Sequence, residues 1–278
     1  MPLQGVALTL KPLHHGGRVV EREMRRIDLN CDMGELPVAI ADGTQEALLR
    51  SITSANVACG GHAGDERTMR TTIEQALRAG VAVGAHPGYP DRENFGRLEL
   101  KMSAEAVANS IFEQVRALAQ VAAACGAKLV HVKPHGALYN QAVKNRELAE
   151  AIAQGVARFS KDLVLMGLAE SPMLAVFRDA GFAAAAEAFA DRRYEPDGTL
   201  RSRKFDDALI RNPEEAAWQA LGIAERGVVI ASNGSEVKLS AQTICIHGDT
   251  PGSVQIAAAV ARTLREAGVA VSALGGHI

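Results

Sequence analysis

The sequence predicts an α/β fold, and more narrowly a (β/α) barrel of about seven parallel strands, similar to a TIM barrel. Three observations predict it. Short apolar or β-branched runs alternate with helical segments from residue 26 onward, which favours a parallel sheet with right-handed crossovers. Most helical segments end at a glycine directly before the next apolar run. The chain has 278 residues, a length typical of one such barrel, although an open doubly wound sheet is the alternative.

Seven segments have the apolar character of buried strands, and an eighth, irregular one follows them. The seven expected strands are 26–31, 53–58, 81–85, 129–133, 163–167, 183–188 and 243–247, and the eighth is 269–273. The clearest helix is expected over 103–125, because apolar residues recur there at helical spacing. Its stripe consists of Val107, Ile111, Val115, Leu118 and Ala122. Residues 228–240 hold a central Asn-Gly pair and predict a hairpin inserted before the last clear strand.

Local signals mark where the helices stop and start. Glycine tolerates the left-handed conformation that closes a helix. Five helices are therefore expected to end at Gly80, Gly126, Gly181, Gly227 and Gly268. A polar capping residue before a proline marks a helix start. Three starts are expected at Ser171-Pro172, Asn212-Pro213 and Thr250-Pro251.

Composition limits the class of protein. Apolar residues make up 47% of the chain and the formal net charge is −2, so we expect a globular protein without an electrostatic footprint for nucleic acid. Four cysteines without a CxxC pair indicate a reducing, cytoplasmic environment, and no apolar run is long enough to span a membrane. We expect residues 26–278 to form a single catalytic barrel domain, and residues 1–25 to form a flexible tail.

Ionisable and polar residues follow six of the expected strands. In parallel α/β folds the carboxyl ends of the strands meet at one face, where the functional site lies. Burying unpaired charges there would cost several kcal/mol each, so folding alone does not explain the set. The candidates in strand order are Asn30 and Asp32; Asn56, Gly60, Gly61 and His62; His86; Lys133 and His135; Glu187, Asp191 and Arg192; and His247.

The residue types suggest roles for these candidates. Asp32, His62, His86 and His135 have the residue types for a divalent metal or for general acid–base catalysis, and the metal itself is assigned to Asp32, His62 and His86. A network that merely holds loops is the alternative. Lys133 faces the same way as His135 and suits an anion or phosphate.

Other residues near these strand ends have simpler explanations. His131 lies deeper than His135 and is expected to be a core or supporting residue. Cys59 is either a nucleophile beside His62 or, more commonly for an unpaired cysteine, a small core residue. Cys31 is expected to pack in the core. No P-loop and no strand–GxGxxG–helix unit is present, so a nucleotide would not bind as it does in those folds.

Seven strings resemble the LamB/YcsF family, to which the A subunit of bacterial ATP-hydrolysing 5-oxoprolinase belongs. They cover nearly the whole chain after residue 25, in order. They are IDLNCDMGE (27–35), SANVACGGHAGDE (54–66), VGAHPGYPD (83–91), FGR (95–97), HVKPHGALYN (131–140), EAFADRRYEPDGTLRSR (187–203) and ICIHGDTPGSVQIA (244–257). The resemblance implies a seven-stranded (β/α) barrel related to carbohydrate deacetylases, and a part in the ATP-dependent conversion of 5-oxoproline to L-glutamate together with subunits B and C.

That chemistry assigns roles to the candidates. Phosphorylation of the lactam oxygen by ATP with Mg²⁺ needs cations, which Lys133 and Arg192 could supply. A base for water could be Asp32, His86 or Glu187, with His62 and His135 as further acid–base groups. The remaining candidates are assigned to substrate or phosphate, namely Asn30, Asn56, Gly60, Gly61, Asp191 and His247, with the backbone N–H groups near Gly60 and Gly61 suited to the substrate carboxylate.

Two other functions remain open from the residues. One is metal-dependent hydrolysis of an amide or N-acetyl group without ATP. The other is a non-catalytic protein that captures a small carboxylate for its partners. The sequence leaves open whether ATP binds this chain, whether a divalent metal is resident, and whether the chain forms a homo-oligomer.

Overall fold

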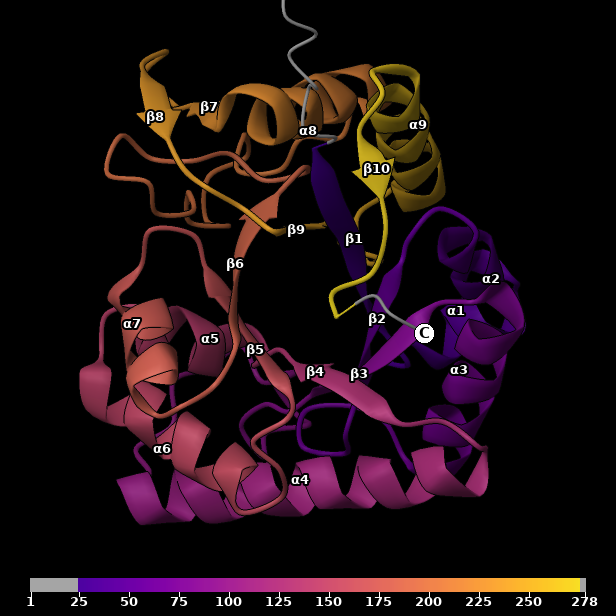
Figure 1. Ribbon diagram of the computed structural model, residues 1–278, viewed down its shortest axis with the longest axis vertical. Coiled ribbons are helices and arrows are strands. Elements are labelled where there is room, and N and C mark those ends of the chain that lie inside the picture. Colours follow the sequence, from indigo (N-terminus) through magenta and orange to yellow (C-terminus); the bar gives the residue numbers. More distant parts are fainter. Residues whose placement is uncertain (1–24, 276–278) are drawn as a thin grey trace, which may run out of the picture.

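The fold is a closed barrel of parallel strands, seen in a computed structural model that describes residues 25–275 (Figure 1). The sheet has the order β10-β1-β2-β3-β4-β5-β6-β9, and a further pairing of β1 with β9 closes seven of these strands into a ring. Asp28 of β1 lies opposite Thr243 of β9, and this register seals the barrel. The predicted barrel is therefore confirmed and the open doubly wound sheet is excluded.

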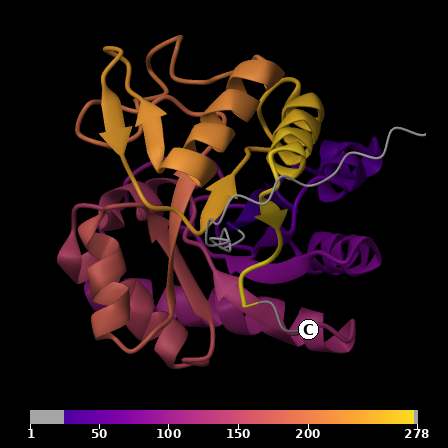
Figure 2. The same ribbon diagram turned by 45° about the horizontal axis from the view of Figure 1, so that its top comes forward.

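The barrel strands lie close to their expected positions. They are β1 (Arg26–Met33), β2 (Ser54–Ala58), β3 (Ala82–His86), β4 (Leu129–Val132), β5 (Val164–Leu168), β6 (Ala184–Phe189) and β9 (Thr243–Cys245). The predicted irregular eighth strand is the short β10 (Ala270–Val271), which pairs only with the first two residues of β1. The predicted hairpin is also present, as the antiparallel pair β7 (Val228–Ile230) and β8 (Glu236–Lys238), at the outer edge of the molecule (Figure 2).

Helices surround the barrel (Figure 1). They are α1 (Pro37–Ala41), α2 (Thr44–Leu49), α3 (Glu66–Ala79), α4 (Ala104–Ala124), α5 (Gly136–Ala142), α6 (Arg146–Ala157), α7 (Pro172–Asp179), α8 (Pro213–Arg226) and α9 (Ser253–Glu266). The predicted apolar stripe of α4 is buried from Val107 to Ala122, so this long helix packs on the barrel through one face. Within residues 25–275, no helix is both long and apolar enough to cross a bilayer.

The helix stops were predicted better than the helix starts. All five glycines have positive φ angles, between 62° and 88°. Asn212 caps α8 by accepting a hydrogen bond from the Glu215 N–H, as predicted. Ser171 precedes α7, but its hydroxyl donates to the Leu168 carbonyl instead of capping the helix. The start at Thr250-Pro251 was wrong: α9 begins at Ser253, and the Thr250 hydroxyl donates to Asp191 at the end of the neighbouring strand β6 instead of capping the helix.

The predicted tail over residues 1–25 lies outside the described residues, apart from Arg25. The Arg25 carbonyl accepts a hydrogen bond from the Ala270 N–H, just before β1 begins. The described chain therefore enters the barrel where the sequence predicted.

Candidate functional site

The carboxyl ends of the strands open into a cavity of about 460 Å³. A pocket of this size suits a small-molecule ligand. Six of the predicted site residues line it, namely Asp32, His86, Lys133, His135, Arg192 and His247. They come from the ends of five different strands, so the barrel gathers at one place residues that are far apart in the sequence.

Asp32 and Lys133 form the centre of the cavity wall. Lys133 Nζ lies 3.0 Å from Asp32 Oδ1 and 3.0 Å from Glu187 Oε1, so one ammonium group bridges two carboxylates. Burial alone would lower the pKa of Lys133, but Asp32 and Glu187 raise it well above its ordinary value. Burial would likewise raise the pKa of Asp32, but His86 and Lys133 outweigh it and hold that pKa well below the ordinary value. The pair is therefore an ammonium and a carboxylate at neutral pH.

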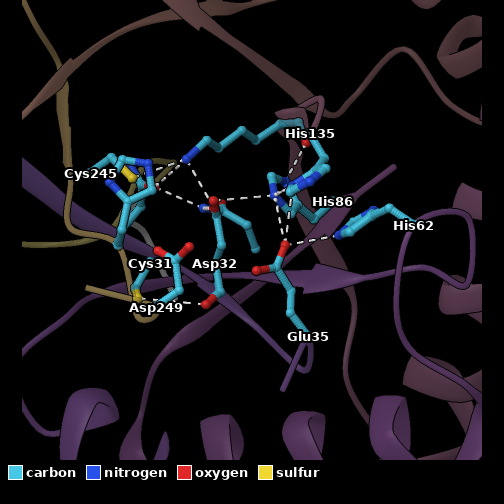
Figure 3. A network of polar contacts seen from close by, with 12 residues as sticks. Cys31, Asp32, Glu35, His62, His86, His135, Cys245 and Asp249 are labelled. Atoms are coloured by element: carbon cyan, nitrogen blue, oxygen red, sulfur yellow. Dashed lines mark hydrogen bonds and ion pairs between the residues drawn. The ribbon is translucent and has the colours of Figure 1, made fainter. Parts of the chain in front are cut away.

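A second cluster is centred on Glu35, which lies between three histidines (Figure 3). Glu35 Oε1 is 2.8 Å from His62 Nε2, 3.1 Å from His135 Nδ1 and 3.5 Å from His86 Nε2. The rings of His62 and His135 are stacked, with centroids 3.6 Å apart. Burial would raise the pKa of Glu35, but the adjacent His135 and His62 side chains lower it below its ordinary value. Burial lowers the pKa of His62 to about 4, so its ring is neutral at physiological pH.

Hydrogen bonds to backbone carbonyls fix two of these histidine rings. His86 Nδ1 lies 2.8 Å from the Lys133 carbonyl oxygen, and His135 Nε2 lies 2.9 Å from the Phe95 carbonyl oxygen. Carbonyl oxygens only accept, so both nitrogens carry hydrogen. In the neutral rings, His86 Nε2 and His135 Nδ1 therefore present lone pairs, and these two atoms are 2.9 Å apart. A proton or a cation is needed between them, and the four side chains offer ligand atoms all within 4.8 Å of one another.

Backbone geometry explains how the cluster assembles. After the strand alternation ends, Gly34 adopts a φ of 74°, which turns the chain and brings Glu35 back over the barrel. Phe95 has a φ of 55°, unusual for a residue with a Cβ. A Cβ at the next position, Gly96, would lie 2.7 Å from the Cβ of His62. The FGR segment therefore fits against the stacked histidines because its backbone can approach them closely.

Three other candidates, Asn30, Asn56 and Glu187, lie beneath the cavity together with His131. Asn30 Nδ2 donates to Glu187 Oε1 (3.0 Å), and Asn56 Nδ2 donates to Asp32 Oδ1 (2.8 Å). His131 Nε2 lies 2.8 Å from Asn56 Oδ1, and burial lowers the pKa of His131 to about 3. None of these four residues lines the cavity. The deeper position expected for His131 is thus observed, and Asn56 and Asn30 contact the cavity-lining Asp32 and Lys133 rather than the cavity itself.

Space for the His131 ring comes from Gly84 on the neighbouring strand. A Cβ at position 84 would lie 2.1 Å from two atoms of the ring, which is far closer than atoms can approach. His131 is itself fully buried. The glycine in the third strand is therefore required by the histidine in the fourth.

Asp191, Arg192 and His247 form a third group at the mouth. Asp191 Oδ1 lies 2.9 Å from His247 Nδ1, and Asp191 Oδ2 accepts from the His247 N–H at 2.9 Å and from the Thr250 hydroxyl at 3.2 Å. Burial would raise the pKa of Asp191, but His247 lowers it below its ordinary value. The Arg192 guanidinium is buried, and burial lowers its pKa to about 10. Its Nη2 donates to the Arg201 carbonyl, while its Nε has no partner among residues 25–275.

The structure does not bring every predicted residue to the cavity. Gly60 and Gly61 lie outside its lining. A Cβ on Gly61 would lie 2.3 Å from Gln114 Oε1, so the glycine makes room for that side chain. Cys59 donates to the Val57 carbonyl, and burial raises its pKa to about 12, which disfavours the nucleophilic thiolate. Cys31 is buried in the core, as expected.

Glu35, Phe95 and Arg97 are site residues that the strand-end pattern did not predict. Each belongs to a string that resembled the family, and Glu35 is the last residue of IDLNCDMGE. Membership of these residues in the family-like strings was the signal that could have identified them. Asp32 and His62 do not share one cluster of candidate metal ligands: Glu35 joins His62, His86 and His135 instead, while Asp32 groups with Cys245 and His247.

Comparisons with known proteins agree with this architecture. A chain from Chloroflexus aggregans, named as the A subunit of 5-oxoprolinase, is 50% identical over 248 residues, which cover 89% of this chain and 98% of that one. A chain of the same name from Methylococcus capsulatus is 48% identical over 254 residues, covering 91% and 98%. The crystal structure of a lactam utilization protein from Thermus thermophilus is 41% identical and has a TM-score of 0.84, covering 90% of this chain and all of that one.

More distant structures share the fold alone. A putative cellobiose-phosphate cleavage protein from Enterococcus faecalis has a TM-score of 0.53 at 14% identity, covering 90% of this chain and 97% of that one. The catalytic domain of a peptidoglycan N-acetylglucosamine deacetylase from Eubacterium rectale has a TM-score of 0.50 at 10% identity, covering 92% and 91%. The model of one family, LamB/YcsF, matches residues 27–277, nearly all of the barrel. The chain therefore belongs to the LamB/YcsF family.

Proposed function

We propose that this chain is the catalytic subunit of ATP-dependent cleavage of 5-oxoproline to L-glutamate, and that it acts in the cytoplasm with subunits B and C. The relatives named as 5-oxoprolinase A subunits support the family role. One observation carries the proposal: a single cavity places acid–base groups beside Arg192, a buried guanidinium that has no carboxylate within salt-bridge distance among residues 25–275. Residues 26–278 form the catalytic domain in this proposal.

The reaction requires both kinds of group. A five-membered lactam is a stable amide, and transfer of a phosphoryl group from ATP to its oxygen makes the ring carbon electrophilic, with ADP leaving. Water then adds to that carbon, the bond to the ring nitrogen breaks, and the resulting acyl phosphate is hydrolysed by a second water. Cations are needed for the phosphoryl charge, and a base and an acid are needed for the proton transfers.

The cavity contains two kinds of cation: one is paired with carboxylates and the other has no carboxylate partner. Lys133 is held by Asp32 and Glu187, so it orients these carboxylates and stabilises negative charge near them. The Arg192 guanidinium has an unpartnered Nε among residues 25–275, and a planar fork of this kind pairs well with phosphate or carboxylate oxygens. Arg192 is therefore the group we assign to the phosphoryl or carboxylate end of a ligand. Arg97 and Arg203, both paired with Asp249, extend the positive rim.

The Glu35 cluster fits a divalent ion. Its donor set is one carboxylate and three imidazoles, the ligand types of a zinc-like ion. His86 and His135 already donate their other N–H groups to carbonyls, which is how protein metal sites orient histidine ligands. We assign the ion to Glu35, His62, His86 and His135, with Asp32 beside them. When bound there, the ion would supply Lewis-acid polarisation of the lactam carbonyl.

Metal content tests this assignment independently of activity. The purified chain should be dialysed against a chelator, supplied with Zn²⁺ or Mn²⁺, dialysed again and analysed for metal and thermal unfolding. An ion that binds only the folded state at a hundred times its Kd stabilises it by about 2.7 kcal/mol, so the wild type should retain metal and melt higher. Glu35→Ala should lose both effects, and the exposed matched control Glu93→Ala should keep them. An equal metal-induced shift in Glu35→Ala would contradict the assignment.

Reconstitution tests the function itself. Glutamate release from 5-oxoproline should require this chain, subunits B and C, and ATP, as each is omitted in turn. His86→Ala should abolish glutamate formation while the complex still assembles. ATP-independent amide hydrolysis by this chain alone would instead support the metal-dependent hydrolase. Unchanged turnover in His86→Ala would support a protein that only binds a small carboxylate.

A further inference from the structure

His247 lies at the end of the last barrel strand, where one of its ring nitrogens is hydrogen-bonded and the other is not. His247 Nδ1 lies 2.9 Å from Asp191 Oδ1. The carboxylate can only accept, so this nitrogen carries the hydrogen and the lone pair of the neutral ring is on Nε2. Nε2 has no hydrogen-bond partner within residues 25–275, and the residue lines the cavity.

The position of this ring is fixed from several sides. The His247 N–H donates to the same carboxylate at 2.9 Å, so backbone and ring are anchored together. The Phe189 ring stacks on it, with centroids 5.5 Å apart and an interplanar angle of 15°. Asp191 is fully buried and also accepts from Thr250. The free nitrogen is therefore held in one direction, toward the cavity.

The groups facing His247 fit proton transfer. Asp32 and Cys245 each place a ligand atom within 4.8 Å of it. Lys133 Nζ lies 3.1 Å from the Cys245 sulfur, and Arg192 and Asp249 line the same cavity. By contrast, His86 Nε2 lies 3.3 Å from Asp32 Oδ2 and 3.5 Å from Glu35 Oε1, and His135 Nδ1 is directed at Glu35 and at His86. Among the cavity-lining histidines, His247 is thus the one whose free nitrogen is available to a ligand.

We propose that His247 is the catalytic residue that moves the proton during lactam opening, and that Asp191 is its positioning residue. The inference rests on the proposed function. As a water oxygen forms its bond to the ring carbon whose oxygen has been phosphorylated, His247 Nε2 takes one of the two protons of that water. As the bond between that carbon and the ring nitrogen breaks, the imidazolium returns this proton to the nitrogen, which leaves as the amine, and the added hydroxyl gives its remaining proton to solvent to become the C=O of the acyl phosphate. The histidine ends the cycle neutral, and Asp191 stabilises the intervening imidazolium.

The test uses the reconstituted complex with 5-oxoproline and ATP. His247→Ala should lower kcat by roughly a hundredfold to ten-thousandfold, the usual contribution of general acid–base catalysis, with the KM for 5-oxoproline little changed. Added imidazole should restore part of this rate. Asp191→Asn should also lower kcat, because an amide N–H facing Nδ1 favours the tautomer with hydrogen on Nε2, and imidazole should not restore it. Lys133→Ala, treated with the same imidazole, controls for nonspecific activation.

The outcomes separate this inference from the function on which it rests. A wild-type complex that forms no glutamate would refute the proposed function. An active wild type with a loss of less than about tenfold in His247→Ala, well under the usual acid–base contribution, would overturn the role of His247. If added imidazole restores no activity to His247→Ala, the role of His247 is likewise overturned. If His247→Ala does not fold, His247→Gln replaces it: this side chain fills the space but cannot take the proton, so near-normal kcat in that variant would overturn the inference.

Discussion

The two ends of the barrel interior use polar residues differently. Near the amino ends of the strands, the floor consists of Asp28, Thr53, Ser54 and Thr243. Both Asp28 oxygens are occupied there: Oδ1 accepts from Thr53 and Ser54 at 2.7 Å, and Oδ2 accepts from Thr243 at 2.5 Å. At the mouth, Arg192 Nε and His247 Nε2 have no partner within residues 25–275. Asp28 and Arg192 are both buried, so the difference between them lies in whether their hydrogen bonds are completed.

This difference separates structural polar groups from functional ones. A buried polar group without a partner costs roughly 1–3 kcal/mol, and a fold does not gain from leaving it so. The completed network at the floor is explained by folding alone, because it holds β1, β2 and β9 in register. Under the proposed function, a ligand in the cavity completes the pairs that are left open at the mouth.

The largest effect is expected at Lys133, which bridges Asp32 in the cavity wall and the deeper Glu187. Lys133→Met leaves the Asp32 and Glu187 carboxylates facing each other without their cation. We expect glutamate release by the reconstituted complex to fall by roughly a hundredfold or more, and the free energy of unfolding to fall by about 3–5 kcal/mol. The rate of glutamate release per folded molecule measures the first effect, and urea denaturation measures the free energy of unfolding. Lys128→Met is the matched control, since Lys128 is exposed near the other end of the same strand. Equal effects of Lys133→Met and Lys128→Met on rate and stability would contradict a central role for Lys133.

At the floor, stability should change without a change in chemistry. Thr243→Val keeps the shape of the side chain but removes the donor to Asp28 and the acceptor for Asn30 Nδ2. Unfolding free energy should decrease by about 1–3 kcal/mol, while kcat per folded molecule stays near that of the wild type. A large loss of kcat with stability intact would show that the floor takes part in the reaction and would break the comparison.

The free energy of unfolding should depend on pH through His131, which lies beneath the cavity. Burial lowers its folded pKa from 6.5 to about 3, so the unfolded chain binds more protons between these values. Stability from neutral His131 is therefore complete above pH 6.5 and is lost as the pH falls toward 3. From pH 7 to pH 5, the wild type should lose about 2 kcal/mol more than His131→Gln, as measured by urea unfolding at each pH. Thr243→Val, which removes no titrating group, should keep the wild-type slope; identical slopes in wild type and His131→Gln would disprove the assignment.

Regular features of the sequence predicted the barrel and much of its mouth. Strand alternation placed Asp32 inside, and the shared direction of parallel strands brought His86, Lys133 and His247 to the same cavity. Glu35 was missed because Gly34 breaks the alternation, and a turn with positive φ redirects the chain in a way that periodicity cannot describe.

Tertiary contacts explain the other differences from the sequence expectations. Gly60 and Gly61 were expected to form a loop that contacts a ligand. The structure instead packs Gly61 against Gln114, a helix residue far along the chain. The start of α9 was misplaced because Thr250 bonds Asp191 rather than the helix. In each case a contact between distant segments overrides a local signal.

The fit between Gly84 and His131 also bears on how this chain can change through evolution. A side chain at position 84 would occupy the space of the imidazole, and loss of the imidazole would remove the partner of Asn56 Oδ1. A first step at position 84 is blocked by collision, whereas a first step at position 131 opens a void beside the glycine and leaves a buried amide oxygen unbonded. The two positions are therefore expected to be inherited as a pair, with substitutions at 84 accessible only in lineages that have already replaced the ring at 131 with a smaller group.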